Sequence, residues 1–282
     1  MRSYLQKRFS KSLYHRAYSR AFYTLIGVVL QEIRCVFKQF YTFRYPVGSF
    51  LNVIRISSSS VLRLFLGRSA KYSFAFTGED RIIEGIIKPI INKPGTYVDV
   101  GCNHPKFLSN TYGLYKKGWT GLCIDANEKL IKKYRFYRPK DIAVSAVISS
   151  EAKDVDFYEI ENDVLSTLEQ DNLEEAVQLG LSYRKTKRKS STLTSILEQH
   201  KIKKDFDILS IDAEEHDFDV LSSVDFAEYR PKLIIVEDED FNFSDYSTNR
   251  FVKFLKEKKY KMIGYVLKNA YFTPTDRDMV IK

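Results

Sequence analysis

The sequence predicts an α/β protein with a doubly wound, mostly parallel sheet, an antiparallel hairpin at one edge and a basic helical N-terminal arm. Three observations support this fold class. Helix and strand patterns alternate from about residue 72 onward. Strands such as DILSI at 207–211 and KLIIVE at 232–237 are apolar on both faces, which is typical of parallel strands covered by helices on both sides. The last two expected strands follow one another without a helix between them, which favours the edge hairpin.

The arm, residues 1–71, carries most of the positive charge. The 282-residue chain has a net charge of +9. Residues 1–71 contain 13 lysines and arginines and a single acid, Glu32, which amounts to +12. The domain that we expect at residues 72–282 contains 32 basic and 35 acidic residues, which amounts to −3. Nucleic-acid binding therefore has little support, because the basic balance describes the arm alone.

The arm has the pattern of a basic amphipathic helix. Its apolar residues recur every four positions: Leu5, Phe9, Leu13, Ala17, Ala21 and Leu25. Such a helix could bind an anionic membrane through residues 1–45, pack on the domain with its charges in water, or be a targeting segment. The longest apolar run, residues 21–30, is too short to span a bilayer, which takes about 20 residues. The three cysteines lack metal-ligand spacing, so we expect a cytoplasmic protein that could associate peripherally with a membrane.

The elements of the domain follow in chain order from their apolar patterns. A helix is expected at residues 79–90, because Ile82, Ile83, Ile86 and Ile87 share one face. The next elements are strand 97–100, helix 110–117, strand 120–124, helix 129–137, strands 141–148 and 155–159, helix 195–199, strand 206–211, helix 218–222, strand 232–237, helix 249–259, and strands 261–267 and 269–273. Residues 150–192 fit this alternation least well. Their five basic residues within 184–189 are typical of a solvated, mobile loop, although they could contact an anionic substrate.

Polar residues at the strand ends are the candidates for a site, because ligands of open α/β sheets lie beyond the carboxyl ends of the strands. The candidates in chain order are Asp99, Gly101, Asn103, Asp125, Asn127, Ser145, Asp212, Glu214, His216, Glu237 and Asp238. Asp125 ends a strand 24 residues after Gly101, the spacing at which an acid accepts hydrogen bonds from ribose hydroxyls. Gly101 would let a ligand approach the backbone. The pair predicts a cofactor that contains a nucleoside.

The turn after Gly101 indicates which cofactor. The G-x-G-x-x-G fingerprint is missing, since Cys102, Asn103 and His104 follow the glycine. A pyrophosphate needs backbone N–H groups at a glycine-rich turn, so a dinucleotide is disfavoured. S-adenosylmethionine has no phosphate, and Asp99 could attract its amino group. We expect His104 to make a local hydrogen bond in the turn.

The second cluster is the alternating set Asp212, Glu214 and His216, at the end of a strand. In extended chain these three residues share one face and could converge. They could take a proton from a hydroxyl or hold a hard cation through oxygen. Alternatively, residues 214–217 simply begin the next helix, where acids interact favourably with the helix dipole.

At these residues the sequence resembles the FkbM family of S-adenosylmethionine-dependent methyltransferases. The resemblance covers residues 75–273 and rests on FTGEDRII, GTYVDVGCNHPKFLSNTYGLYKKGWTGLCIDAN, DIAVSAVIS, LTSILEQHKIKKDFDILSIDAEEHDFDVL and RPKLIIVE, in the family's order. It implies a class I methyltransferase fold with a seven-stranded sheet whose last strand is antiparallel. It also implies methyl transfer to an oxygen, often a hydroxyl of a sugar or of a secondary metabolite.

Carried over by position, the resemblance implies a cofactor site and a catalytic site. Asp99, Gly101 and Asn103 would line the cofactor and Asp125 would hold its ribose; we add Ser145 in the third strand. Asp212, Glu214 and His216 match the family's Asp-x-Glu-Gly-His segment and would be catalytic. The sequence departs from the family at Glu215, where glycine is usual, and a positive φ there would strain a glutamate by about 1 kcal/mol or more.

These residues predict an in-line displacement in which the protein aligns the acceptor oxygen behind the methyl carbon. His216 or one of the carboxylates would remove the hydroxyl proton, and a divalent cation could assist. Two other functions remain open. One is a non-catalytic, membrane-associated binding module with this fold, which Glu215 and the basic arm favour. The other is an NAD(P)-dependent oxidoreductase, which the single glycine of the turn disfavours.

Overall fold

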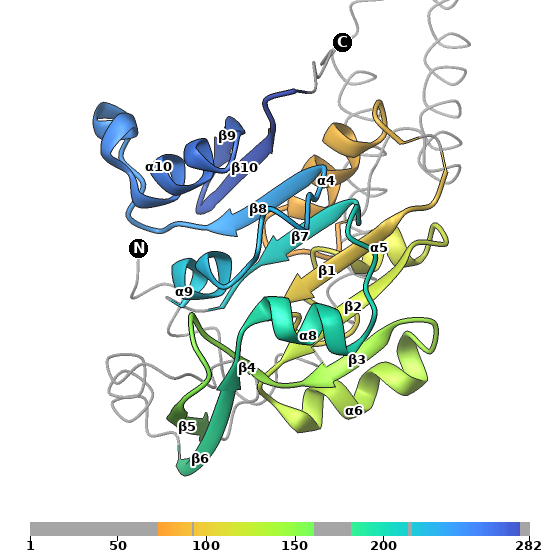
Figure 1. Cartoon of the computed structure of the whole chain (residues 1–282). Coiled ribbons are helices and arrows are strands. Elements are labelled where there is room, and N and C mark those ends of the chain that lie inside the picture. Colours follow the sequence, from red (N-terminus) through yellow and green to blue (C-terminus); the bar gives the residue numbers. More distant parts are fainter. Residues whose placement is uncertain (1–72, 92, 161–181, 214–215, 277–282) are drawn as a thin grey trace, which may run out of the picture. The chain divides into compact units, whose positions relative to one another are not determined.

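The computed structural model describes residues 73–91, 93–160, 182–213 and 216–276 (Figure 1). The chain divides into residues 1–72 and residues 73–282, and all described residues belong to the second unit. The helical arm expected at residues 1–71 therefore lies outside the described residues, as do Glu214 and Glu215. Within the described ranges, no helix is both long and apolar enough to cross a bilayer.

A seven-stranded sheet forms the centre of the domain (Figure 1). Its strands are β1 (Thr96–Val100), β2 (Thr120–Asp125), β3 (Ile142–Ser145), β7 (Ile208–Ile211), β8 (Leu233–Glu237), β9 (Tyr260–Val266) and β10 (Asn269–Pro274). The order across the sheet is β3-β2-β1-β7-β8-β10-β9, and only β10 runs antiparallel to its neighbours. This arrangement confirms the doubly wound sheet and the edge hairpin. It is the class I methyltransferase topology that the resemblance implies.

Helices cover both faces of the sheet, which explains why its central strands are apolar on both sides. One layer consists of α4 (Glu79–Ile87), α5 (Tyr112–Tyr115) and α6 (Glu128–Tyr137), and the other of α8 (Leu193–Gln199), α9 (Asp217–Ser222) and α10 (Arg250–Glu257). Alternate residues of β1 reach opposite layers: Val98 and Val100 pack with α8, α9 and α10, whereas Tyr97 packs with α4, α5 and α6.

Side-chain caps fix where three of these helices begin. The side-chain oxygens of Asn127, Thr192 and Asn249 accept backbone N–H groups in the first turns of α6, α8 and α10. Each such cap stabilises its helix by about 1 kcal/mol. The cap at Asn127 matters for the site, because it starts α6 two residues after the carboxyl end of β2.

A small second sheet corrects two expectations. It contains β4 (Val147–Ile148), β5 (Asp154–Ile160) and β6 (Tyr183–Ser191) in the order β4-β6-β5. Residues 141–148 are therefore two strands in different sheets, which separate at Ala146. The basic run 184–189 lies in strand β6 and is not a loop. Cross-strand pairs explain why it is extended: β5 supplies acids opposite the basic residues, and Lys185 forms an ion pair with Asp156 at 2.8 Å.

The register of the parallel strands brings the predicted site to one edge of the main sheet. Val100 lies opposite both Ile124 and Ile211, and Ile211 lies opposite Val236. The residues that follow each of these positions are therefore neighbours at the carboxyl edge: Gly101, Asp125, Asp212 and Glu237.

Candidate active site

Gly101 allows the ends of β1 and β7 to meet. Its φ is +73°, and a Cβ at this position would lie 1.6 Å from the carbonyl oxygen of Asp212. Any other residue would clash with that backbone and adopt a strained conformation. The glycine therefore accommodates the Asp212 backbone, a role that the sequence did not suggest, and its contact with a cofactor stays a prediction. The neighbouring amide completes the junction, because Asp212 N donates to Val100 O at 3.0 Å.

The turn after β1 uses its backbone N–H groups within the protein. The amides of Gly101 and Cys102 both donate to the carbonyl oxygen of Ile124, at 2.9 and 3.1 Å. The amide of Asn103, a residue with φ of +47°, donates to Oδ2 of Asp125 at 2.8 Å. The strand end and its turn are thus held on β2 by three hydrogen bonds.

His104 closes the remainder of the turn. Its Nδ1 accepts the backbone N–H groups of Lys106 and Phe107, at 3.2 and 3.3 Å, which confirms the local hydrogen bond expected for this histidine. In all, five backbone amides after β1 are directed at protein acceptors. This turn does not offer them as a cradle for a pyrophosphate.

Asp125 anchors the turn and remains able to accept further hydrogen bonds. Its Oδ2 accepts Asn103 N, and its Oδ1 accepts Asn127 N at 2.7 Å. The residue is half-buried at the end of β2. Each carboxylate oxygen has two lone pairs and can accept more than one hydrogen bond. Ser145 lies beside Asp125 in the register of β2 and β3, with an exposed side chain whose Oγ donates to Ala126 O at 3.3 Å.

Asp99 faces the protein interior and not the sheet edge. It is 3% exposed, and its Oδ2 accepts the hydroxyl of Thr111 at 2.5 Å. Burial raises the pKa of the carboxyl to about 6, although the nearby Arg138 and the bond from Thr111 act in the opposite direction. A contact between Asp99 and the amino group of a cofactor remains a prediction.

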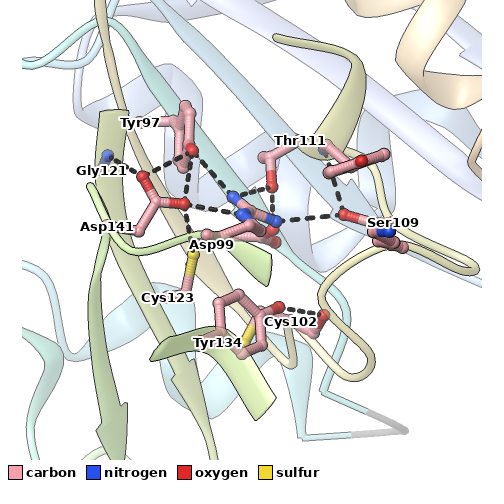
Figure 2. A network of polar contacts seen from close by, with 12 residues as sticks. Tyr97, Asp99, Cys102, Ser109, Thr111, Gly121, Cys123, Tyr134 and Asp141 are labelled. Atoms are coloured by element: carbon pink, nitrogen blue, oxygen red, sulfur yellow. Dashed lines mark hydrogen bonds and ion pairs between the residues drawn. The ribbon is translucent and has the colours of Figure 1, made fainter. Parts of the chain in front are cut away.

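The group around Asp99 is a buried polar network that the sequence did not predict (Figure 2). At its centre is the guanidinium of Arg138, whose residue is 0% exposed. Arg138 donates from Nε to Oδ2 of Asp141 at 2.6 Å and from an Nη to the hydroxyl oxygen of Tyr97 at 2.7 Å. The same Nη also donates to Thr111 at 3.0 Å, and the other Nη donates to Ser109 at 3.3 Å.

The network connects the end of α6 to the segment that follows β1. Tyr97 lies on β1, Thr111 immediately precedes α5, and Arg138 and Asp141 follow α6. Tyr134 of α6 adds a hydrogen bond from its hydroxyl to the carbonyl oxygen of Cys102 at 2.8 Å (Figure 2). The loop that borders the candidate cofactor site is therefore fixed at both ends by buried groups.

Asp212 and Glu237 form a carboxyl pair at the ends of β7 and β8. Their side chains lie within hydrogen-bonding reach of each other. Burial raises the pKa of Glu237, while the bond to Asp212 and the ammonium of Lys268 lower it. The carboxylate of Glu237 lies 3.8 Å from Lys268 Nζ. Glu237 was one candidate strand end among many in the sequence, and only the register identifies it as the partner of Asp212.

His216 does not continue the strand, so the argument from extended chain was wrong at this residue. The amide of His216 donates to Ala213 O at 3.3 Å in a turn, and His216 is the N-cap residue of α9. Its Nδ1 lies 3.7 Å from Oδ2 of Asp219, on the same helix. The alternative expectation, that this segment begins the next helix, is confirmed at this residue.

Most of the predicted site residues among those described meet at one edge of the sheet: Gly101, Asn103, Asp125, Ser145 and Asp212. Asp99 is buried beneath this edge, and His216 lies at the start of α9. Within the same ranges, no group of three or more His, Cys, Asp or Glu side chains is arranged to hold a metal ion. The arrangement places the carboxylate of Asp125 and the Asp212–Glu237 pair at the same edge of the sheet.

A family model and two solved structures are similar to this chain. The family model described as the methyltransferase FkbM domain matches residues 99–262. A TehB-like SAM-dependent methyltransferase from Corynebacterium glutamicum is 14% identical over 77% of this chain and 97% of its own, with a TM-score of 0.39. Monomeric WbdD is 14% identical over 76% of this chain and 45% of its own, with a TM-score of 0.37. No curated protein matches the chain.

Proposed function

The chain belongs to the FkbM methyltransferase family, and from this premise we propose that it transfers a methyl group from S-adenosylmethionine to a hydroxyl oxygen of a glycan or a secondary metabolite. The choice of cofactor rests on the direction of the backbone N–H groups in the turn after β1. Its five amides donate to protein acceptors, so a dinucleotide would find no N–H cradle for its pyrophosphate. This supports a phosphate-free nucleoside over NAD(P).

Four residues at the edge would hold the cofactor. The carboxylate of Asp125 would accept the ribose hydroxyls, as acids at this position do in doubly wound folds. Ser145 stands next to Asp125 in the register and can donate a hydrogen bond. Gly101 and Asn103 shape the turn beneath the ligand. The side-chain Oδ1 of Asn103 is buried and finds no hydrogen-bond partner within the described part of the chain, so it is available to a ligand N–H or O–H group.

The carboxyl pair would act on the acceptor. When bound, S-adenosylmethionine supplies an electrophilic methyl group. A carboxylate of the Asp212–Glu237 pair would accept the proton of an acceptor hydroxyl, which makes the acceptor oxygen more nucleophilic. His216, at the start of α9, is the alternative base, and Glu214 keeps the role that the family resemblance implies. The rigid turn at Gly101 would keep this carboxyl pair aligned with the donor site.

Cofactor binding and methyl transfer test the proposal together. We expect S-adenosylhomocysteine, but not NAD, to raise the melting temperature of the full chain. Asp125→Asn should raise the Kd for S-adenosylhomocysteine about 10-fold or more, because hydrogen bonds to a charged acceptor are lost. Asp205→Asn is the matched control, since Asp205 is exposed before β7 at the opposite edge of the sheet. Equal binding by both variants, or stabilisation by NAD instead, would contradict the proposal.

Transfer of a radiolabelled methyl group to a panel of glycans and polar hydroxylated metabolites then identifies the acceptor. Asp212→Asn should lower kcat while leaving S-adenosylhomocysteine binding intact, because the carboxyl pair acts on the acceptor and not on the nucleoside. The melting temperature of each variant shows whether it is folded.

A further inference from the structure

The ribbon formed by β5 and β6 reaches the turn that follows Asp125. Strand β4 begins directly after β3, with only Ala146 between them, and it pairs with β6, so the ribbon lies beyond the carboxyl end of β3 (Figure 1). Since β3 is the neighbour of β2, the ribbon is close to the strand end that carries Asp125. Arg188 of β6 makes the connection, because its Nη1 donates to the carbonyl oxygen of Ala126 at 2.8 Å. The small sheet is therefore bonded to the residue next to the acid that we assign to the ribose.

A buried aromatic ring supports the side chain of Arg188. In the register of the ribbon, Val155 lies opposite Arg188 and Phe157 lies opposite Thr186, so Phe157 and Arg188 are diagonal neighbours on one face. The guanidinium carbon of Arg188 lies 5.0 Å from the centre of the Phe157 ring, and Phe157 is 2% exposed. A guanidinium that rests on a fixed ring keeps its direction better than one that extends into water. Arg188 is thus held in the orientation in which it donates to Ala126.

One peptide group links Arg188 to the carboxylate of Asp125. The C=O of Ala126 and the N–H of Asn127 belong to the same planar peptide unit. Arg188 binds the oxygen of this unit, and the N–H of the unit donates to Oδ1 of Asp125 at 2.7 Å. Ser145 Oγ also donates to the Ala126 oxygen, but at 3.3 Å and without a charge. Because charge-assisted hydrogen bonds are about twice as strong as neutral ones, Arg188 is the main anchor of this peptide.

We propose that Arg188 is a positioning residue of the cofactor site and acts on the ribose through Asp125. Donation by the guanidinium holds and polarises the peptide between Ala126 and Asn127, which strengthens the bond from its N–H to Asp125. The carboxylate is then aligned for the ribose hydroxyls before the cofactor arrives, so less freedom is lost on binding. This inference rests on the proposed function, because it assigns a further residue to the ribose contact of the same site.

Adenosine and 2′,3′-dideoxyadenosine test this role, because they differ only in the two ribose hydroxyls. The Kd of each for the full chain is measured by ligand-observed NMR, and the ratio of the two values reports on the hydroxyl contact alone. We expect the wild type to bind adenosine about 10-fold more tightly, as hydrogen bonds to a charged acceptor should provide. Arg188→Met keeps apolar contact with Phe157 but removes the donor, so the preference should fall to about 3-fold or less. A ribbon that only stabilised the fold would leave the ratio unchanged.

Arg184→Met is the matched control, because Arg184 is exposed on the same face of β6 and the substitution removes the same charge. It should keep the preference of about 10-fold. Arg188→Lys retains a charged donor and should keep a preference of about 5-fold or more. A preference that is unchanged in Arg188→Met, or that falls equally in Arg184→Met, would overturn the role of Arg188.

Melting temperatures and the Kd for S-adenosylhomocysteine are measured on the same samples. Arg188→Gln, which removes the charge and shortens the side chain, replaces Arg188→Met if the latter is not folded. If S-adenosylhomocysteine fails to bind the wild type, the proposed function falls and the role of Arg188 falls with it. If it binds but the wild type does not prefer adenosine, Asp125 does not hold the ribose and the role of Arg188 is contradicted. If the wild type and the variant prefer adenosine to the same extent, the role of Arg188 alone falls.

Discussion

Replacing Arg138 by methionine should destabilise the domain more than any exposed substitution. The guanidinium is inaccessible to water and forms an ion pair with Asp141, whose side chain is also 0% exposed. The aromatic rings of Tyr97, Tyr115 and Tyr134 lie 5.1–5.4 Å from the guanidinium carbon. Removing one partner of a buried ion pair leaves the other charge uncompensated, which costs about 3–5 kcal/mol. That is a large part of the roughly 5–15 kcal/mol that stabilises a typical domain.

Urea unfolding followed by the fluorescence of Trp119 measures this loss. Trp119 is the only tryptophan of the chain and is 6% exposed, so its signal reports on the described domain. Arg135→Met is the matched control, because Arg135 is exposed on the same helix and contacts the ring of Phe136. It should change the free energy of unfolding by no more than about 0.5 kcal/mol.

A double-mutant cycle with Asp141→Asn separates the ion pair from the packing. Once Arg138 is methionine, neutralising Asp141 removes a charge that has lost its partner, so the double variant should be more stable than the sum of the single losses predicts. A cost below about 1 kcal/mol for Arg138→Met, or the same cost as for Arg135→Met, would refute the assignment of a buried charge network.

Two further predictions concern the end of β1. The pKa of Asp99 in the folded domain is raised to about 6, so the stability that its protonated form contributes is complete below pH 4 and is lost as the pH rises through 6. Over this range the free energy of unfolding of the wild type, relative to that of Asp99→Asn, should fall by about 3 kcal/mol. A difference that does not change with pH would contradict the burial of this carboxyl. Gly101→Ala should lower the free energy of unfolding by at least about 1–2 kcal/mol and weaken S-adenosylhomocysteine binding, because its Cβ would meet Asp212 O at a positive φ. Gly264→Ala, whose Cβ would meet nothing within 4 Å, should be neutral in the same unfolding and binding measurements.

The sequence predicted the sheet, and predicted which residues meet at its carboxyl edge, because both follow from backbone rules. Buried parallel strands are apolar on both faces, and parallel register places successive strand ends side by side. Gly101 and Asp125 could be paired on that basis, and the structure places them on adjacent strands. The role of Gly101 could not be predicted, because the close approach of the Asp212 backbone depends on how β7 enters the sheet.

The buried network and the basic strand were missed for a different reason. Arg138 ends a polar helix just before a proline, a position that is usually solvated, and apolar periodicity carries no information about buried polar side chains. Its partners lie on β1, in the segment before α5 and in the segment after α6. Strand β6 was interpreted as a loop because its charge run was considered without β5, whose acids neutralise it from across the ribbon.

The absence of a glycine-rich turn now has a physical explanation. Such turns need glycine so that consecutive N–H groups can point outward at phosphate oxygens without interference from side chains. Here the same N–H groups point inward, at Ile124 O, Asp125 and His104, so residues bulkier than glycine are tolerated in the turn. Protein groups accept the hydrogen bonds that a phosphate accepts in a glycine-rich turn. Asp125 holds the turn, and in the proposed function it also binds the ribose. Its replacement should therefore disturb both, which is why the melting temperature must accompany every Kd measured for that variant.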